Sequence, residues 1–156
     1  MPKFITRSFT FTLLLTVATF SFANPGDKDN APAVDLVVTE VSTPNLVVPL
    51  ETTFTVKSTV KNEGRSAASE ETTLRFYLSS DTAITSAGVE LDQTLTIPAL
   101  EAGESSSEET VLTVPEDMLP GIYFVGVIVD EVNQQPETNE TNNSNSPSTT
   151  TITVVF

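Results

Sequence analysis

A nine-residue apolar run, Gly121–Val129, most constrains what this chain can fold into. Its residues are nearly all β-branched or aromatic, which suits a strand buried on both faces, and the run is too short for a stable isolated helix. Pro120 supplies a turn immediately before it, because proline fixes φ in advance. Tyr123 therefore lies just after a corner, where sandwich domains of the immunoglobulin type place a buried phenol whose hydroxyl bonds back to an upstream backbone group. The alternative is that Tyr123 is simply a half-buried aromatic.

Shorter segments of alternating apolar and polar residues fill much of the remaining chain. The segment Thr52–Asn62 places apolar residues on one face, and Thr72–Ser79 does the same with Arg75 and Tyr77 facing outward. The inward residues of these two segments are Phe54, Val56, Val60, Leu74, Phe76 and Leu78. Further strands are expected at Val34–Ser42, Val47–Leu50, Val89–Leu100, Thr110–Val114 and Thr149–Phe156.

The segments between these strands are rich in turn residues, and Glu101–Glu109 is expected to be an exposed bridge. Pro44 and Pro49 indicate an edge strand, because proline removes a donor from the ladder. No segment shows a sustained helical period. The pattern therefore predicts an all-β, antiparallel β-sandwich of about seven strands, seven or eight by direct count.

The first residues predict a cleaved signal peptide at 1–23. Lys3 and Arg7 precede an apolar stretch from Phe9 to Phe22, and Ala23 occupies a small position before the cleavage point. A flexible tether is expected at 24–33 and a single folded domain at 34–156. The mature chain is expected to be secreted, periplasmic or on the cell surface, and not to be an integral membrane protein.

The charge and the missing residue types exclude several function classes. The mature chain would carry 5 basic and 21 acidic residues, a net charge of −16, which disfavours nucleic acid and anionic membranes as partners. The sequence has no Cys and no His, so the usual catalytic base and transition-metal ligands are missing and the fold depends on its core alone. We expect no enzymatic activity. With no Trp, and Tyr77 expected as an ordinary surface aromatic, sugar stacking has little support.

The segment that follows the apolar run is the densest patch of carboxylate and amide side chains. Calcium takes about six to eight such oxygens, so one hypothesis is a calcium site, with Asp81 or Asp92 as added ligands. Its ligands would be Asp130, Asn133, Glu137, Asn139 and Glu140. The alternative is that these side chains bind their own backbone and fix a long connection. That alternative is favoured, so no cofactor is expected.

Several segments together resemble the CARDB domain, a cell-adhesion-related domain of bacteria. They are DLVVTEVSTP (35–44), VKNEGRSAA (60–68), LRFYLSSD (74–81), IPALEAGES (97–105), PGIYFVGVIVD (120–130) and ETNETNN (137–143). The resemblance covers residues 34–156 and implies an immunoglobulin-like sandwich in exported or cell-surface proteins, usually as a repeated or appended module. This sequence contains one copy, with no second repeat or catalytic neighbour recognisable in it.

These observations predict an exported, non-catalytic binding or adhesion module whose partner is a protein or an extracellular polysaccharide. Two contact modes are open, strand addition at an exposed edge and contact through the acidic loop, and the loop is favoured because prolines guard the edges. The contact residues would be Asp130, Glu131, Glu137, Asn142 and Asn143. The alternatives are a calcium-dependent module that binds polysaccharide or matrix, and a structural subunit of an envelope assembly.

Overall fold

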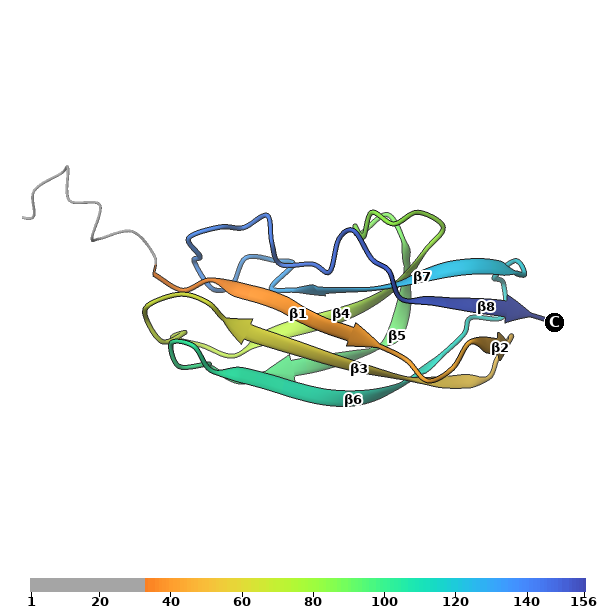
Figure 1. The fold of residues 1–156 in the computed structure, drawn as a ribbon, viewed down its shortest axis with the longest axis horizontal. Coiled ribbons are helices and arrows are strands. Elements are labelled where there is room, and N and C mark those ends of the chain that lie inside the picture. The colour runs from red at the N-terminus through yellow and green to blue at the C-terminus, as the bar shows by residue number, and fades with distance from the viewer. Residues whose placement is uncertain (1–32) are drawn as a thin grey trace, which may run out of the picture. The chain divides into compact units, whose positions relative to one another are not determined.

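The computed structural model describes residues 33–156, and these form two packed β-sheets with no helix in that range (Figure 1). The signal peptide expected at 1–23 lies outside the described residues, as does the tether expected at 24–33 apart from Ala33. Within 33–156, nothing has the length and apolar character of a membrane-crossing helix.

Eight strands make up the sandwich, so the expected all-β architecture is confirmed. They are β1 (Leu36–Ser42), β2 (Val47–Pro49), β3 (Thr53–Asn62), β4 (Thr72–Ser79), β5 (Val89–Ile97), β6 (Ser105–Thr113), β7 (Gly121–Val129) and β8 (Thr151–Val155). One sheet has the order β1-β3-β6, and the other has the order β2-β8-β7-β4-β5. All strand pairs are antiparallel except β2 with β8, which run parallel.

The core lies between the sheets and is formed by the inward residues of the alternating segments. Phe54, Val56 and Val60 of β3 and Leu74, Phe76 and Leu78 of β4 are all buried, as the alternation predicts. Their neighbours on the outer faces, such as Lys57 and Arg75, form ion pairs at the surface. With no disulfide, this apolar contact between sheets is what the fold depends on.

The prediction that Gly121–Val129 is buried on both faces is correct only for its second half. On the inner face Val125, Val127 and Val129 are fully buried. On the outer face Gly126 is buried and Ile128 is half-buried, whereas Ile122 is 65% exposed. The 80–88 loop covers the outer face of the strand at Gly126. A methyl group on Gly126 would lie 2.7 Å from Cδ1 of Ile84, a residue of that loop.

The same loop corrects the expectation that Tyr77 is a surface aromatic. Tyr77 does lie on the outer face of its sheet, where it pairs with Gly126, but only 2% of it is exposed. Gly88 of the covering loop comes close enough that a Cβ there would lie 3.5 Å from Cβ of Tyr77. The alternation gives the face of a strand residue but not what lies over that face.

Tyr123 confirms the expected corner, since its hydroxyl donates to the carbonyl oxygen of Leu119 at 2.8 Å. The structure corrects the expected bridge at Glu101–Glu109, because β6 begins at Ser105 and pairs with β3 along its whole length. Serine and glutamate are weak strand formers, but the backbone groups of β3 provide the ladder that holds them. The edge strand expected near Pro49 is confirmed, because β2 pairs only with β8.

The segment between Asn143 and Thr150 continues along the edge of β7 without being a regular strand. Val129 donates to Asn143 and Val125 donates to Thr150, each through backbone groups at 2.8 Å. Between these two bonds the side chain of Asn145 substitutes for a backbone partner, accepting from the Val127 N–H at 2.9 Å and donating to the Val125 carbonyl at 3.1 Å. This segment closes the edge of β7 ahead of β8.

Candidate functional site

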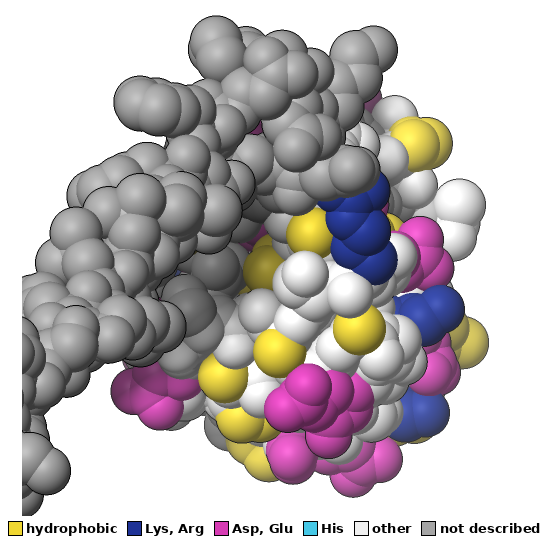
Figure 2. Space-filling model, turned by 90° about the vertical axis from the view of Figure 1, so that its left-hand side faces the viewer, with side chains coloured by type: hydrophobic (Ala, Val, Ile, Leu, Met, Phe, Trp, Pro, Cys, Tyr) yellow, Lys and Arg dark blue, Asp and Glu magenta, His cyan; other side chains and the backbone are white. Residues whose placement is uncertain are grey.

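The acidic and amide-rich loop, residues 130–143, leaves the end of β7 and packs beside the start of β1 at the left-hand end of Figure 1. Thr138 donates its backbone N–H to the carbonyl of Val34 at 2.8 Å, and Asn142 donates its side-chain amide to Asp35 at 2.8 Å. Figure 2 faces this end and shows acidic and basic side chains exposed among polar groups and scattered hydrophobic side chains. The loop therefore belongs to a mixed surface at one end of the sandwich.

Asp130 opens the loop and fixes its first turn. It is only 1% exposed, and its φ of 50° lies in the left-handed region that Asp tolerates better than most residues. Its carboxylate accepts from the Thr72 hydroxyl and from the backbone N–H groups of Gln134 and Gln135, each at 2.8 Å. Three donors on one carboxylate make Asp130 the anchor of the turn.

Gln135 ties this loop to the loop between β3 and β4, a role the sequence did not reveal. Its side chain is buried, and its oxygen accepts from the backbone N–H groups of Ser69 at 2.9 Å and Glu70 at 3.2 Å. No local pattern predicts this, because 65 residues separate Gln135 from Glu70. The contact is possible only because the sandwich brings the two loops to the same end.

Glu137 is a carboxylate held between the loop and β1. It is 7% exposed; Oε2 accepts from the backbone N–H of Leu36, and Oε1 accepts from the side-chain amide of Asn143 at 2.8 Å. Burial raises the pKa of Glu137 to about 7, against the lowering effect of the Leu36 N–H and the Asn143 amide. The nearby charges of Glu140 and Asp130 raise it further.

The five residues considered as calcium ligands are in one loop, but most of their oxygens hold backbone donors. Asn139 Oδ1 accepts from the Thr141 N–H at 3.1 Å, and Glu140 Oε1 accepts from the Glu137 N–H at 3.0 Å. Asn133 is exposed and adopts a left-handed φ of 52°. Among residues 33–156, no three acidic side chains gather in a way that could hold a metal ion.

The two further candidates, Asp81 and Asp92, lie in the 80–88 loop and in β5, where each accepts from a backbone N–H. Among the buried side-chain oxygens of the 130–143 loop, the ones without a partner are Oδ1 of Asn142 and Oδ1 of Asn143. The buried carboxylates of Asp130 and Glu137 already accept from backbone donors, which they would have to give up to join a shell of about six to eight oxygens around calcium. The side chains as placed therefore do not present a calcium shell.

The five residues expected to contact a partner divide into inner and outer ones. Asp130, Glu137 and Asn143 are buried and hold the loop together, and Asn142 is half-buried. Glu131 accepts from the Tyr77 hydroxyl at 2.8 Å and pairs with Arg75 at 3.3 Å, on the outer face of the five-stranded sheet. The exposed side chains of the loop are instead Val132, Asn133, Gln134, Pro136, Thr138, Asn139, Glu140 and Thr141.

Comparison with known proteins gives one family. The family model of the CARDB domain matches residues 33–147. Among solved structures, a CARDB domain from Pyrococcus furiosus, crystallised in complex with di-metal ions, is 25% identical, with a TM-score of 0.57 over 80% of this chain and 96% of that one. A domain of a Methanosarcina acetivorans protein assigned to the cell surface is also 25% identical, with a TM-score of 0.55 over 78% of this chain and 92% of that one. No curated protein sequence matches significantly.

Proposed function

Because the chain belongs to the CARDB family, we propose that it is an exported, non-catalytic binding or adhesion module that contacts its partner through the 130–143 loop. The family is associated with the cell surface. The partner in this proposal is a protein or an extracellular polysaccharide. The lack of Cys and His in the chain supports a role without catalysis.

The rigidity of the loop carries the proposal. Three buried side chains, Asp130, Gln135 and Glu137, bond to backbone groups of the loop or of β1 and the β3–β4 loop. A loop that is already ordered loses little conformational entropy when it binds, which favours affinity. The outer side chains that such a loop presents include one apolar residue, Val132, 64% exposed, beside exposed amides and Glu140.

The test is a crosslinking pull-down from envelope extract with three forms of the protein. The loop variant carries Val132→Ser and Glu140→Lys, and the control variant carries Val111→Ser and Glu116→Lys, which are exposed and lie outside the loop. We expect one reproducible partner that the wild type and the control variant retain and the loop variant loses. A partner retained by the loop variant would assign binding to another surface.

A calcium-dependent module that binds polysaccharide or matrix is the second candidate, favoured by the unpaired Oδ1 atoms of Asn143, beside Glu137, and of Asn142, beside Asp35. The Pyrococcus furiosus relative in complex with di-metal ions adds support. In this candidate, millimolar Ca²⁺ raises the melting temperature relative to excess chelator, and glycan binding is lost with chelator. The same melting temperature in Ca²⁺ and in chelator would argue against it.

A further inference from the structure

The free edge of β1 is a second surface, distinct from the 130–143 loop. In the three-stranded sheet, β1 pairs with β3 along one edge, and its other edge faces the segment 144–150 without a strand between them. An unpaired edge exposes backbone donors and acceptors, which are a template for another strand. The side chains of Glu137 and Thr150 bind backbone groups at the two ends of this edge, and the backbone groups between them have no partner within 33–156.

These two contacts show which backbone groups point outward. The Leu36 N–H is bound by Glu137, and the Val41 carbonyl accepts from the Thr150 hydroxyl at 2.7 Å, so both residues direct their backbone groups away from β3. In an antiparallel pair the N–H and C=O of one residue point to the same side, and the side alternates along the strand. Val38, two residues after Leu36 in regular register, therefore also points outward.

Four backbone groups are available at this edge as a result: the carbonyl of Leu36, the N–H and carbonyl of Val38, and the N–H of Val41. None of the four bonds to another residue within 33–156. A β-bulge between Val38 and Glu40 separates the first three groups from the fourth. Together they offer two donors and two acceptors, as a strand edge does.

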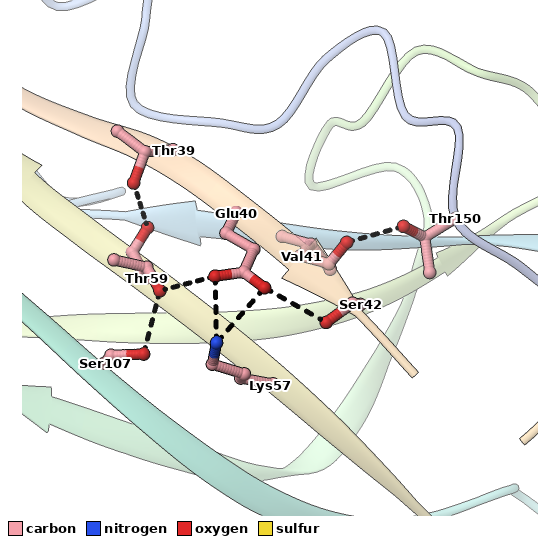
Figure 3. A network of polar contacts seen from close by, with 8 residues as sticks. All are labelled: Thr39, Glu40, Val41, Ser42, Lys57, Thr59, Ser107 and Thr150. Atoms are coloured by element: carbon pink, nitrogen blue, oxygen red, sulfur yellow. Dashed lines mark hydrogen bonds and ion pairs between the residues drawn. The ribbon is translucent and has the colours of Figure 1, made fainter. Parts of the chain in front are cut away.

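A groove of about 430 Å³ lies beside the groups of Val38 and Val41, which are among its lining residues. Its walls are Val38–Val41 on one side and the polar segment 144–150 on the other. Figure 3 shows Thr150 reaching the carbonyl of Val41 at one end, while Glu40 binds Lys57 at 3.0 Å and Thr59 at 3.3 Å on the outer face of the sheet. These outer contacts hold β1 against β3 and do not involve its free edge.

We propose that the β1 edge binds an extended peptide segment of a partner protein, which adds as a further strand in the groove beside Val38–Val41. Main-chain hydrogen bonds would give the affinity, and the small hydroxyl groups of the opposite wall fit a segment rich in Thr, Ser and Val. With 21 acidic residues against 7 basic ones in the sequence, the chain favours a basic segment over an acidic one. The same charge disfavours a second copy of this chain as the occupant.

The experiment records amide hydrogen exchange and amide NMR shifts of the purified protein with the acetylated, amidated hexapeptide Lys-Thr-Val-Thr-Val-Lys. We expect the Val38 and Val41 amides to exchange rapidly in the free protein and to become protected when the peptide is added. Shift changes should be confined to β1 and the segment 144–150. The charge-matched peptide Lys-Thr-Pro-Thr-Pro-Lys, which lacks ladder donors, should produce neither effect.

A pair of variants separates the backbone contact from the loss of a side chain. Val38→Pro removes the outward N–H, and Val38→Ala keeps it while also truncating the buried side chain. We expect about tenfold weaker peptide binding for Val38→Pro than for Val38→Ala, as for one lost hydrogen bond. Both variants are checked for native amide dispersion in NMR spectra. If Val38→Pro does not fold, Val41→Pro and Val41→Ala replace the pair, because the Val41 N–H is the other outward donor.

Three results would overturn the proposal. The first is equal effects of the two peptides, and the second is shift changes confined to the 130–143 loop. The third is a dimer in sedimentation without peptide in which the Val38 amide is already protected, because the occupant would then be a second copy of the chain.

Discussion

At the scale of single residues, the two buried carboxylates of the 130–143 loop have different structural roles. Asp130 accepts three donors and fixes a turn, whereas Glu137 accepts two and joins the loop to β1. Beside Glu137, the Asn143 amide donates through nitrogen and leaves its oxygen unpaired. If Glu137 gains a proton, a turn of this amide lets its oxygen accept from the new hydroxyl, so both protonation states can be satisfied.

This arrangement predicts the pH dependence of stability. The pKa of Glu137 rises from 4.5 to about 7 on folding, so between these values the folded chain holds a proton that the unfolded chain has lost. The contribution of this group to the free energy of unfolding is therefore present at low pH and lost as pH rises from about 4.5 to about 7. The shift corresponds to a loss on the order of 3 kcal/mol.

The measurement is urea unfolding of the wild type and of Glu137→Gln at pH 5 and pH 8. A glutamine reproduces the protonated state, because its amide can donate to the free Asn143 oxygen while its carbonyl accepts from Leu36. The variant should match the wild type at pH 5 and exceed it by about 2 kcal/mol at pH 8. The exposed change Glu116→Gln is the control, and equal pH slopes in all three proteins would contradict the assignment.

Gly126 gives a second prediction at this scale. A side chain at Gly126 meets Ile84, which is 4% exposed and has little room to move, so Gly126→Ala should lower the free energy of unfolding by about 1–3 kcal/mol. Gly121→Ala in the same strand is the matched control, because the nearest atom there is 3.7 Å away, at an ordinary contact distance. Denaturant unfolding measures the free energy of unfolding of both variants. Equal values would show that the 80–88 loop moves aside at little cost.

At the scale of elements, the segment 143–150 shows how side chains can complete a sheet edge. Some of its bonds to β7 are made by backbone groups and others by side chains. Asn145 accepts from the Val127 N–H, and Ser148 donates to the Val125 carbonyl at 2.7 Å. The segment is therefore irregular in backbone geometry but still closes the edge of β7. It also forms one wall of the groove beside β1.

Asn145→Ala should therefore destabilise the protein although it removes only a partly exposed side chain. The Val127 N–H would lose its 2.9 Å partner beside a fully buried valine, at a cost of about 2 kcal/mol. Gln134→Ala, in the exposed part of the neighbouring loop, should cost less than about 0.5 kcal/mol. Thermal unfolding measures the melting temperatures of the two variants. Equal melting temperatures would mean that water accepts from the Val127 N–H in place of the Asn145 side chain.

At the scale of the whole molecule, the acidic excess opposes folding through self-repulsion, since the sequence carries a net charge of −14. Raising the salt concentration from about 0.01 M to about 1 M shortens the screening length from about 30 Å to about 3 Å. The melting temperature at pH 7 should therefore rise by a few degrees. At pH 3 most carboxylates are protonated and the rise should disappear; the same rise at both pH values would point to an effect other than screening.

From the sequence, every strand could be located except the first half of β6, and most strand residues could be assigned to a sheet face, because alternation is a local property wherever one face is buried. The sequence also determined the corner at Tyr123 and the edge strand at Pro49, which depend on one or two residues. The family was recognisable from the same local signatures. These features therefore agree between the sequence and the structure.

Tertiary structure alone decided what covers each face and which distant groups meet. It buries Tyr77 under the 80–88 loop, extends β6 back to Ser105, and bonds Glu137 to Leu36 across 101 residues. It also buries Asn62, whose side-chain amide donates to the backbone carbonyls of Ser66 and Leu100. A carboxylate or amide in a loop has the same local sequence whether it faces water or a backbone donor, so only the packing of the two sheets distinguishes a ligand from a structural anchor.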